Sequence, residues 1–464
     1  NETISALSGS GDINLGSGTL SVGDSSSTTF SGVISGTGNF GKAGSGVLTL
    51  SGSNSYTGNT TVGGGTLSIA GDANLGSAPG SPAATSITLN GGILQLTAGF
   101  TLNANRGLSL GAGNGTLDTT SGTMLYGGII AGAGALTKSG AGTLTLSGSS
   151  TYTGSTTVSA GVLNVQNNAA LGGAAGTTTV ASGAALHLDG NGLIIDEALN
   201  TLIGTGISNG GALRNLANNN TWSGALTLGS GGARINSDGG TFTVSGGISG
   251  NTRPLTIGGA GDVVLSGILA TTSGTLTKDG TGTLTLSGAN TFTGDTTLSS
   301  GVIKVQHDTA LGTGGGDTLV GSGTALQIDG SGLIIDEDLN TVTGTGVGNN
   351  GALRNLANNN TWSGAITLAS GGARINSDAG SLTLSSNING NTQPLTIGGA
   401  GNVVISGVIG TTSGSLTKDG AGTLSLSGNN TFTGGTTVSA GTVQLGASDR
   451  LANGGAVSVS SGAV

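Results

Sequence analysis

The clearest absences in this 464-residue chain are those of cysteine, proline and aromatic side chains. With no cysteine, disulfide bonds, thiol catalysis and cysteine-ligated metals are excluded, which suits a chain that crosses an oxidising compartment unfolded. The few aromatic residues (2 Trp, 3 Tyr and 6 Phe) exclude an ordinary aromatic-rich globular core. With only 4 prolines and no glycine at every third position, the chain is not collagen.

Charge is scarce as well, since only 7 % of the residues are charged. The 12 basic and 21 acidic side chains give a net charge of −9, the wrong sign for binding phosphate backbones or anionic lipid, so we expect no nucleic acid partner. No apolar run reaches the roughly 18 residues of a membrane span, so we expect no membrane insertion by this segment. The start, Asn1-Glu2-Thr3, lacks a signal-peptide pattern, and we expect targeting and anchoring parts to lie outside this chain.

What the chain does contain is glycine, at 98 positions, and small apolar side chains in alternation. Residues 283–286, 296–298 and 302–305 alternate Leu, Ile or Val with Thr, Ser or Lys, which is typical of strands with one buried face. Gly, Asn and Asp separate such bursts, and these residues accept the positive φ of tight corners. The pattern predicts an all-β chain with a corner about every 8 to 12 residues.

Two repeat periods organise the chain. Residues 211–225 and 351–365 are identical, and Lys138, Lys278 and Lys418 follow one another at equal intervals. Each lysine opens a shorter signature, of which a divergent copy surrounds Lys42. In all four copies an aromatic residue occupies the same slot after the lysine; these residues are Tyr56, Tyr152, Phe292 and Phe432. Fixed periods of this kind indicate a solenoid or an array.

The spacing of the copies favours a parallel β-helix. The interval from Lys42 to Lys138 is shorter than the later intervals by about two solenoid turns of roughly 20 to 25 residues each. A β-sandwich also has strands at this spacing, but a closed domain would not tolerate such a loss. We predict one continuous β-solenoid over residues 1–464, an elongated rod on the order of 100 Å long. Its internal units are residues 42–137, the long repeats 138–277 and 278–417, and the partial unit 418–464.

The signature G-x-G-T-L-T-L-S-G-x-N-T-[FY]-T-G-x-T-T-[VL]-x-x-G resembles the passenger-associated transport repeat, also called the autotransporter-associated β-strand repeat. The match is close at residues 140–165, 280–305 and 420–445, and looser at residues 44–69. This repeat occurs in the secreted passenger regions of Gram-negative autotransporter adhesins and related large surface proteins. The resemblance implies a right-handed β-helix, export across two membranes, display at the cell surface and repeats that help the passenger to fold.

Patterns that suggest catalysis or ligand binding are incomplete. Residues 36–42 resemble a phosphate-binding loop, but Ala43 stands where Ser or Thr would hold magnesium. Ser109 lies in a nucleophile-elbow pattern without the helix and the histidine that such a site requires. Asp196-Glu197 and its copy Asp336-Glu337 are adjacent residues that face opposite sides of a strand, so we interpret them as solvated corners. We expect no catalytic residue, no metal and no cofactor.

One candidate binding surface emerges from spacing. Arg214, Arg234 and Arg253 follow one another at intervals of about 20 residues, near one turn, and so predict a column on one face. The first two recur as Arg354 and Arg374. Trp222 and its copy Trp362 are too large for a narrow interior, so we expect them at a corner or on the surface nearby, where Arg and Trp anchor partners. A duplicated packing tryptophan is the alternative interpretation.

The sequence thus predicts a non-enzymatic extracellular passenger or stalk segment that serves adhesion or spacing at the surface of a Gram-negative-type bacterium. Its partner would be a host or bacterial surface glycan or protein. Two alternatives remain open. The chain would self-associate through open β-helix ends into extracellular or matrix filaments, since unpaired edges invite pairing, or it would be a carbohydrate-active β-helix enzyme.

Overall fold

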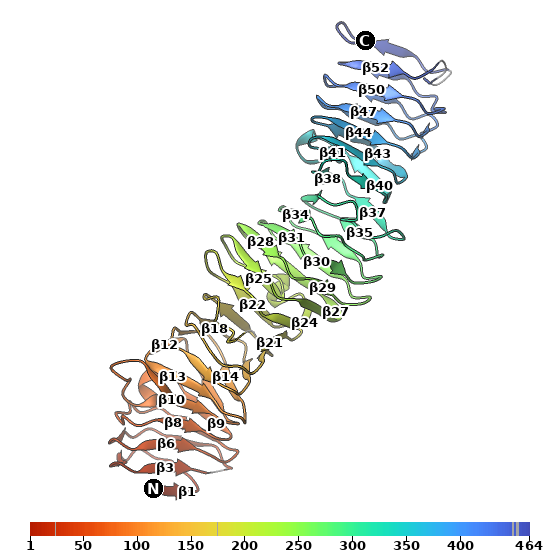
Figure 1. Cartoon of the computed structure of the whole chain (residues 1–464). Coiled ribbons are helices and arrows are strands. Elements are labelled where there is room, and N and C mark those ends of the chain that lie inside the picture. The colour runs from red at the N-terminus through yellow and green to blue at the C-terminus, as the bar shows by residue number, and fades with distance from the viewer. Residues whose placement is uncertain (24, 174, 448–449, 452–453) are drawn as a thin grey trace. The chain divides into compact units, whose positions relative to one another are not determined.

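The computed structural model describes residues 1–23, 25–173, 175–447, 450–451 and 454–464, almost all of them in short β-strands and corners (Figure 1). Within these ranges there is no α-helix and no helix long and apolar enough to cross a membrane. Three 3-10 turns occur there, η1 (Asp72–Leu75), η2 (Ile207–Asn209) and η3 (Val347–Asn349). The all-β prediction is confirmed. The chain divides into two compact units, Asn1–Gly229 (unit 1) and Ser230–Val464 (unit 2).

In each unit, strands of successive turns pair in parallel (Figure 1). In unit 1, β17 (Leu136–Ser139) pairs with β19 (Thr156–Val158), which places Leu136 opposite Thr156. In unit 2, β33 (Leu276–Lys278) pairs with β35 (Thr296–Leu298) in the same register. One turn therefore runs from residue 136 to residue 156, or from residue 276 to residue 296. Both units are parallel β-solenoids, as predicted.

The four signatures form equivalent groups of four strands. These are β6 (Asn39–Lys42), β7 (Val47–Leu50), β8 (Thr60–Val62) and β9 (Thr66–Ile69); β17, β18 (Thr143–Leu146), β19 and β20 (Val162–Val165); β33, β34 (Thr283–Leu286), β35 and β36 (Val302–Val305); β49 (Leu416–Lys418), β50 (Thr423–Leu426), β51 (Thr436–Val438) and β52 (Thr442–Leu445). Each group makes somewhat more than one turn, because its first strand pairs with its third.

The core is a narrow stack of aliphatic side chains. Leu284 of β34 lies between Val263 of β31 (Asp262–Leu265) and Ile303 of β36, and all three are at most 1 % exposed. The alternating threonines of β34 stay half-buried on the outer face. Alternation with period two thus supplies one buried apolar column per strand position, and each buried methylene contributes roughly 0.8 kcal/mol.

Glycine is required where corners stack on corners. Gly140 and Gly161 have φ of 74° and 65°, in the left-handed region that side chains with a Cβ disfavour. A Cβ on Gly161 would lie 2.4 Å from the carbonyl oxygens of Gly140 and Gly142, on the turn before. The high glycine content therefore reflects tight corners in contact across turns.

Candidate functional site: the signature interior and the arginine surface

A buried lysine opens each signature. The side chains of Lys42, Lys138, Lys278 and Lys418 are at most 2 % exposed. The Lys138 ammonium donates hydrogen bonds to the backbone carbonyls of Ser139, Gly140 and Ala160 at 2.8, 2.9 and 3.0 Å. The other three lysines bond the carbonyls at the same offsets along the chain. We call this arrangement the lysine cradle.

The lysine cradle links two consecutive turns through one charge. An ammonium has three donors, and the cradle offers three acceptors, two from one corner and one from the corner of the next turn. Burial lowers the pKa of Lys138 and Lys278 to about 8, and it also lowers the pKa of Lys418. Lys138 and Lys278 are therefore still mostly charged at neutral pH, and their ammonium groups hold the corners together.

The aromatic slot lies in the interior. Tyr56, Tyr152, Phe292 and Phe432 are all 0 % exposed. The Tyr152 hydroxyl lies 2.5 Å from Thr156 Oγ1, and the Tyr56 hydroxyl makes the same contact with Thr60 at 2.6 Å. Burial raises the pKa of Tyr56 to about 12 and also raises the pKa of Tyr152. The slot is thus a packing position, and in the two copies with tyrosine the ring also makes one internal hydrogen bond.

An asparagine bridges three turns in most copies. Asn290 Oδ1 accepts the backbone N–H of Leu269 at 2.8 Å, and its Nδ2 donates to the carbonyl of Ala310 at 2.6 Å. Asn54 and Asn430 make equivalent pairs of bonds. Because Leu269 is one turn earlier and Ala310 one turn later, the amide joins its own turn to both neighbours.

Three of the predicted arginines, Arg234, Arg354 and Arg374, are partly exposed and pair with aspartates of their own chain. The guanidinium of Arg374 makes two parallel bonds of 2.7 Å to the Asp419 carboxylate, and Arg234 binds Asp279 in the same way at 2.7 and 2.8 Å. Arg354 forms an ion pair of 2.6 Å with Asp378. Arg214 is half-buried at the equivalent position.

The single column expected from the arginine spacing is wrong. Arg354 of β41 (Leu353–Asn355) lies opposite Asn376 of β43 (Ile366–Ser377), so Arg374 is two positions out of register. Arg234 likewise lies opposite Thr256 of β30 (Leu255–Gly258), and Arg253 is not in its column. One turn here runs from Arg354 to Asn376 or from Arg234 to Thr256, which is longer than the interval between successive arginines.

Trp222 and Trp362 are 0 % exposed, so their expected surface position is wrong, and their burial agrees with the interpretation of a duplicated packing tryptophan. Trp362 of β42 (Asn359–Trp362) lies between Ile335 of β39 (Ile334–Ile335) and Leu384 of β44 (Ser381–Leu384). The turn from residue 335 to residue 362 is longer than a signature turn, and the indole of Trp362 is enclosed in its interior. Both indole Nε1 atoms lack a hydrogen-bond partner within the described part of the chain. Neither ring is presented at the surface.

The acidic pairs divide between surface and interior. Asp196 and Asp336 are exposed, as solvated corners should be, but Glu197 and Glu337 are only 4 % and 5 % exposed, which corrects the interpretation for the glutamates. Thr178 and Thr318 donate their hydroxyls to these glutamates at 2.7 and 3.0 Å. Burial raises the pKa of both glutamates to about 7. Over the described ranges no three His, Cys, Asp or Glu side chains gather to hold a metal ion.

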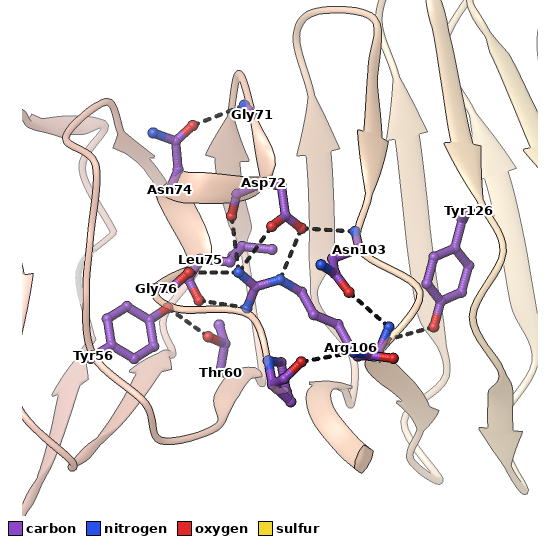
Figure 2. Close-up of polar contacts among 12 residues, drawn as sticks. Tyr56, Thr60, Gly71, Asp72, Asn74, Leu75, Gly76, Asn103, Arg106 and Tyr126 are labelled. Atoms are coloured by element: carbon purple, nitrogen blue, oxygen red, sulfur yellow. Dashed lines mark hydrogen bonds and ion pairs between the residues drawn. The ribbon is translucent and has the colours of Figure 1, made fainter. Parts of the chain in front are cut away.

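Unit 1 has a further buried charge that sequence reasoning missed, Arg106 of β13 (Arg106–Leu110), which is 3 % exposed. Figure 2 shows its guanidinium against η1, with Nε 2.9 Å from Asp72 Oδ1 and further bonds to the carbonyls of Leu75 and Gly76 at 3.0 and 2.6 Å. The Tyr126 hydroxyl donates to the Arg106 carbonyl at 2.7 Å. The equivalent position before Lys278 holds Gly246, so no repeat drew attention to this arginine.

Comparison with known proteins agrees with this geometry. The passenger-associated-transport-repeat family model matches residues 40–69, 136–165, 276–305 and 416–445, the four signatures. The chain is 31 % identical over 353 residues to the "Adhesin BmaC autotransporter" of Brucella suis biovar 1 (strain 1330), a match that covers 74 % of this chain and 9 % of that protein. No solved structure matches. The chain therefore carries four passenger-associated transport repeats and is similar, over most of its own length, to a short part of an autotransporter adhesin.

Proposed function

We propose that this chain is a non-enzymatic passenger segment of an autotransporter-type protein. It is displayed outside a Gram-negative-type bacterium, where it serves adhesion or spacing. The similarity to a protein named as an adhesin supports this proposal, although the chain spans less than a tenth of that protein. The four family repeats and the parallel solenoid of each unit support it as well.

The observation that carries the proposal is that the polar groups of the signature bind the chain's own backbone. In each copy, the lysine ammonium binds backbone carbonyls of two turns. Where an asparagine is present, its amide joins three turns. These groups stabilise the stack and are occupied by the chain's own backbone. The segment thus works through its repeated outer surface.

An enzyme acting on acidic polysaccharides is the rival that the arginines suggested. Arg234 and Arg374 would be its cationic residues, yet both are bound bidentately by Asp279 and Asp419. We expect the purified chain to release neither unsaturated nor reducing sugars from such polysaccharides. Release that disappears in the double variant Arg234→Ala plus Arg374→Ala would overturn the non-enzymatic assignment.

Adhesion is tested by coating beads with the purified chain and counting beads retained on host-cell layers, bacterial cells and immobilised glycans. Retention above that of uncoated beads supports adhesion, and its absence on every surface supports a spacer role. If the surface around the Arg354–Asp378 and Arg374–Asp419 pairs makes the contact, the variants Arg354→Ala and Arg374→Ala should each lower retention. Arg253→Ala, which removes the same charge from an exposed position off the strands, is the matched control. Sedimentation velocity over a concentration series checks that single chains, and not filaments, coat the beads.

A further inference from the structure

Each long repeat contains one buried glutamate that the proposed function does not use. Glu197 lies between β23 (Ile194–Ile195) and β24 (Ala198–Gly204), and Glu337 lies at the same place between β39 and β40 (Asp338–Gly344). Their hydrogen bonds to Thr178 and Thr318 reach the strand of the preceding turn, β21 (Thr177–Val180) or β37 (Asp317–Val320). Each carboxyl therefore links two neighbouring turns, at a place outside the signatures.

The charged groups around Glu337 are all acidic. Asp317 of β37, Asp338 of β40 and Asp295 before β35 each act on it electrostatically. Glu337 also lines a hollow of about 310 Å³ together with Gly314–Gly316 and the aspartates at 317, 336 and 338. No cation is among these lining residues, so an ionised Glu337 carboxylate is buried next to like charges.

The copy in unit 1 differs in those neighbours. Thr177, Ala198 and Ser155 stand where unit 2 has Asp317, Asp338 and Asp295. The ionisable groups near Glu197 are instead Asp196, which lines a hollow of about 180 Å³ with it, and the buried Tyr152 hydroxyl, to which it is electrostatically coupled. Glu197 is thus disfavoured as a carboxylate chiefly by burial, and Glu337 by burial and by three aspartates.

We propose that Glu197 and Glu337 make their turns pH-sensitive: a neutral carboxyl is compatible with its buried position, and ionisation loosens the turn because it leaves a buried negative charge without a cation to pair with. The raised pKa of both groups, to about 7, agrees with this assignment. An unfolded glutamate has a pKa of 4.5, so the folded turn binds more protons between pH 4.5 and about pH 7. The stabilising effect is full below that window and is lost as the pH rises through it.

Hydrogen exchange measured by mass spectrometry at pH 5 and pH 8, corrected for intrinsic rates, tests the proposal on the whole chain. We expect protection in residues 194–204 and 334–344 to be at least ~10-fold lower at pH 8 than at pH 5. Glu337→Gln keeps a neutral hydrogen-bonding side chain, and it should hold residues 334–344 within ~3-fold across this range while residues 194–204 still respond. Glu197→Gln should do the reverse. Equal pH responses in wild type and both variants would overturn the proposal.

The variant Asp295→Ser plus Asp317→Thr plus Asp338→Ala gives unit 2 the neighbours found in unit 1. Without these like charges the pKa of Glu337 should be less raised, because its carboxylate is less disfavoured. The loss of protection in residues 334–344 should therefore be smaller in total and complete at a lower pH than in wild type. An unchanged or larger loss would overturn the contribution assigned to the three aspartates.

Infrared difference spectra of the wild-type chain provide a measurement that does not depend on the variants folding. Protonated carboxyl absorption should disappear between pH 5 and pH 8. A spectrum without a carboxyl that titrates near neutrality would refute the proposal, whatever the variants do. It would leave the adhesive assignment intact, since the bead assay tests that assignment separately.

Discussion

The signatures around Tyr152 and Phe292 are copies of one corner, and each lacks a different polar contact. In the Tyr152 copy the phenol bonds Thr156, whereas Thr296 Oγ1 in the Phe292 copy is buried without a partner among the described residues. In the Phe292 copy Asn290 bridges three turns, whereas the Tyr152 copy has Ser150, whose hydroxyl accepts Ile130 N–H at 3.4 Å. The ring position is therefore fixed by burial, and the polar contacts adjust its stability.

The largest effect is expected from a charge placed in the aromatic slot. Phe292→Asp and Tyr152→Asp each remove a fully buried ring and bury a carboxylate, which costs ~3 kcal/mol or more. Both should lower the melting temperature markedly. Thr291→Asp, at the adjacent exposed position, should change it little. Equal melting of Phe292→Asp and Thr291→Asp would contradict the interior placement.

Loss of a lysine cradle comes next. Lys278→Met keeps the apolar stem but leaves the carbonyls of Asp279, Gly280 and Ser300 without their donor, at a cost of ~2 to 4 kcal/mol. Lys138→Met should cost about the same, because its cradle is equivalent. The urea midpoint measures both, and Lys304→Met, which removes a half-exposed lysine, is the control. A cradle variant no less stable than this control would show that the buried ammonium contributes nothing net.

Exchanging the residues at the bridging position, Asn290 and Ser150, should reduce the difference in stability between the two copies. Asn290→Ser loses the bond to Ala310 and should destabilise unit 2 by ~1 kcal/mol. Ser150→Asn supplies an amide at the position from which it would reach the Ala170 carbonyl, and should stabilise unit 1 by a similar amount. Thermal melting and local hydrogen exchange distinguish the units. A loss of stability in Ser150→Asn would mean that the corner around Tyr152 has no room for the amide.

The smallest effect concerns the hydroxyl itself. Phe292→Tyr gives Thr296 a partner and should stabilise by up to ~1 kcal/mol, and Tyr152→Phe should destabilise by about as much. Thermal melting measures both changes. In a double-mutant cycle that combines Phe292→Tyr with Thr296→Val, the stabilisation by the new hydroxyl should disappear. If it persists, the tyrosine gains its stability from packing and not from the threonine.

The strands and the aromatic slot were predictable from sequence, because alternation reports which side chains face the core and the slot recurs in every copy. The lysine cradle was not. A lysine between polar neighbours is ordinarily exposed, and its three acceptors are backbone atoms brought together only by stacking. The predicted positions of the tryptophans and the predicted arginine column were both wrong. Both assumed turns of about 20 residues, whereas the turns from Ile335 to Trp362 and from Arg354 to Asn376 are longer.

The lysine cradle also bears on how such repeats diverge. Its acceptors are main-chain oxygens, which every residue type has, so the positions that supply them are free to change. The residue after the lysine is Ala43, Ser139, Asp279 or Asp419, and the acceptor on the next turn is Gly64, Ala160, Ser300 or Ala440. Duplicated copies can therefore drift in outward sequence, and acquire new surfaces, while one lysine preserves the joint between turns.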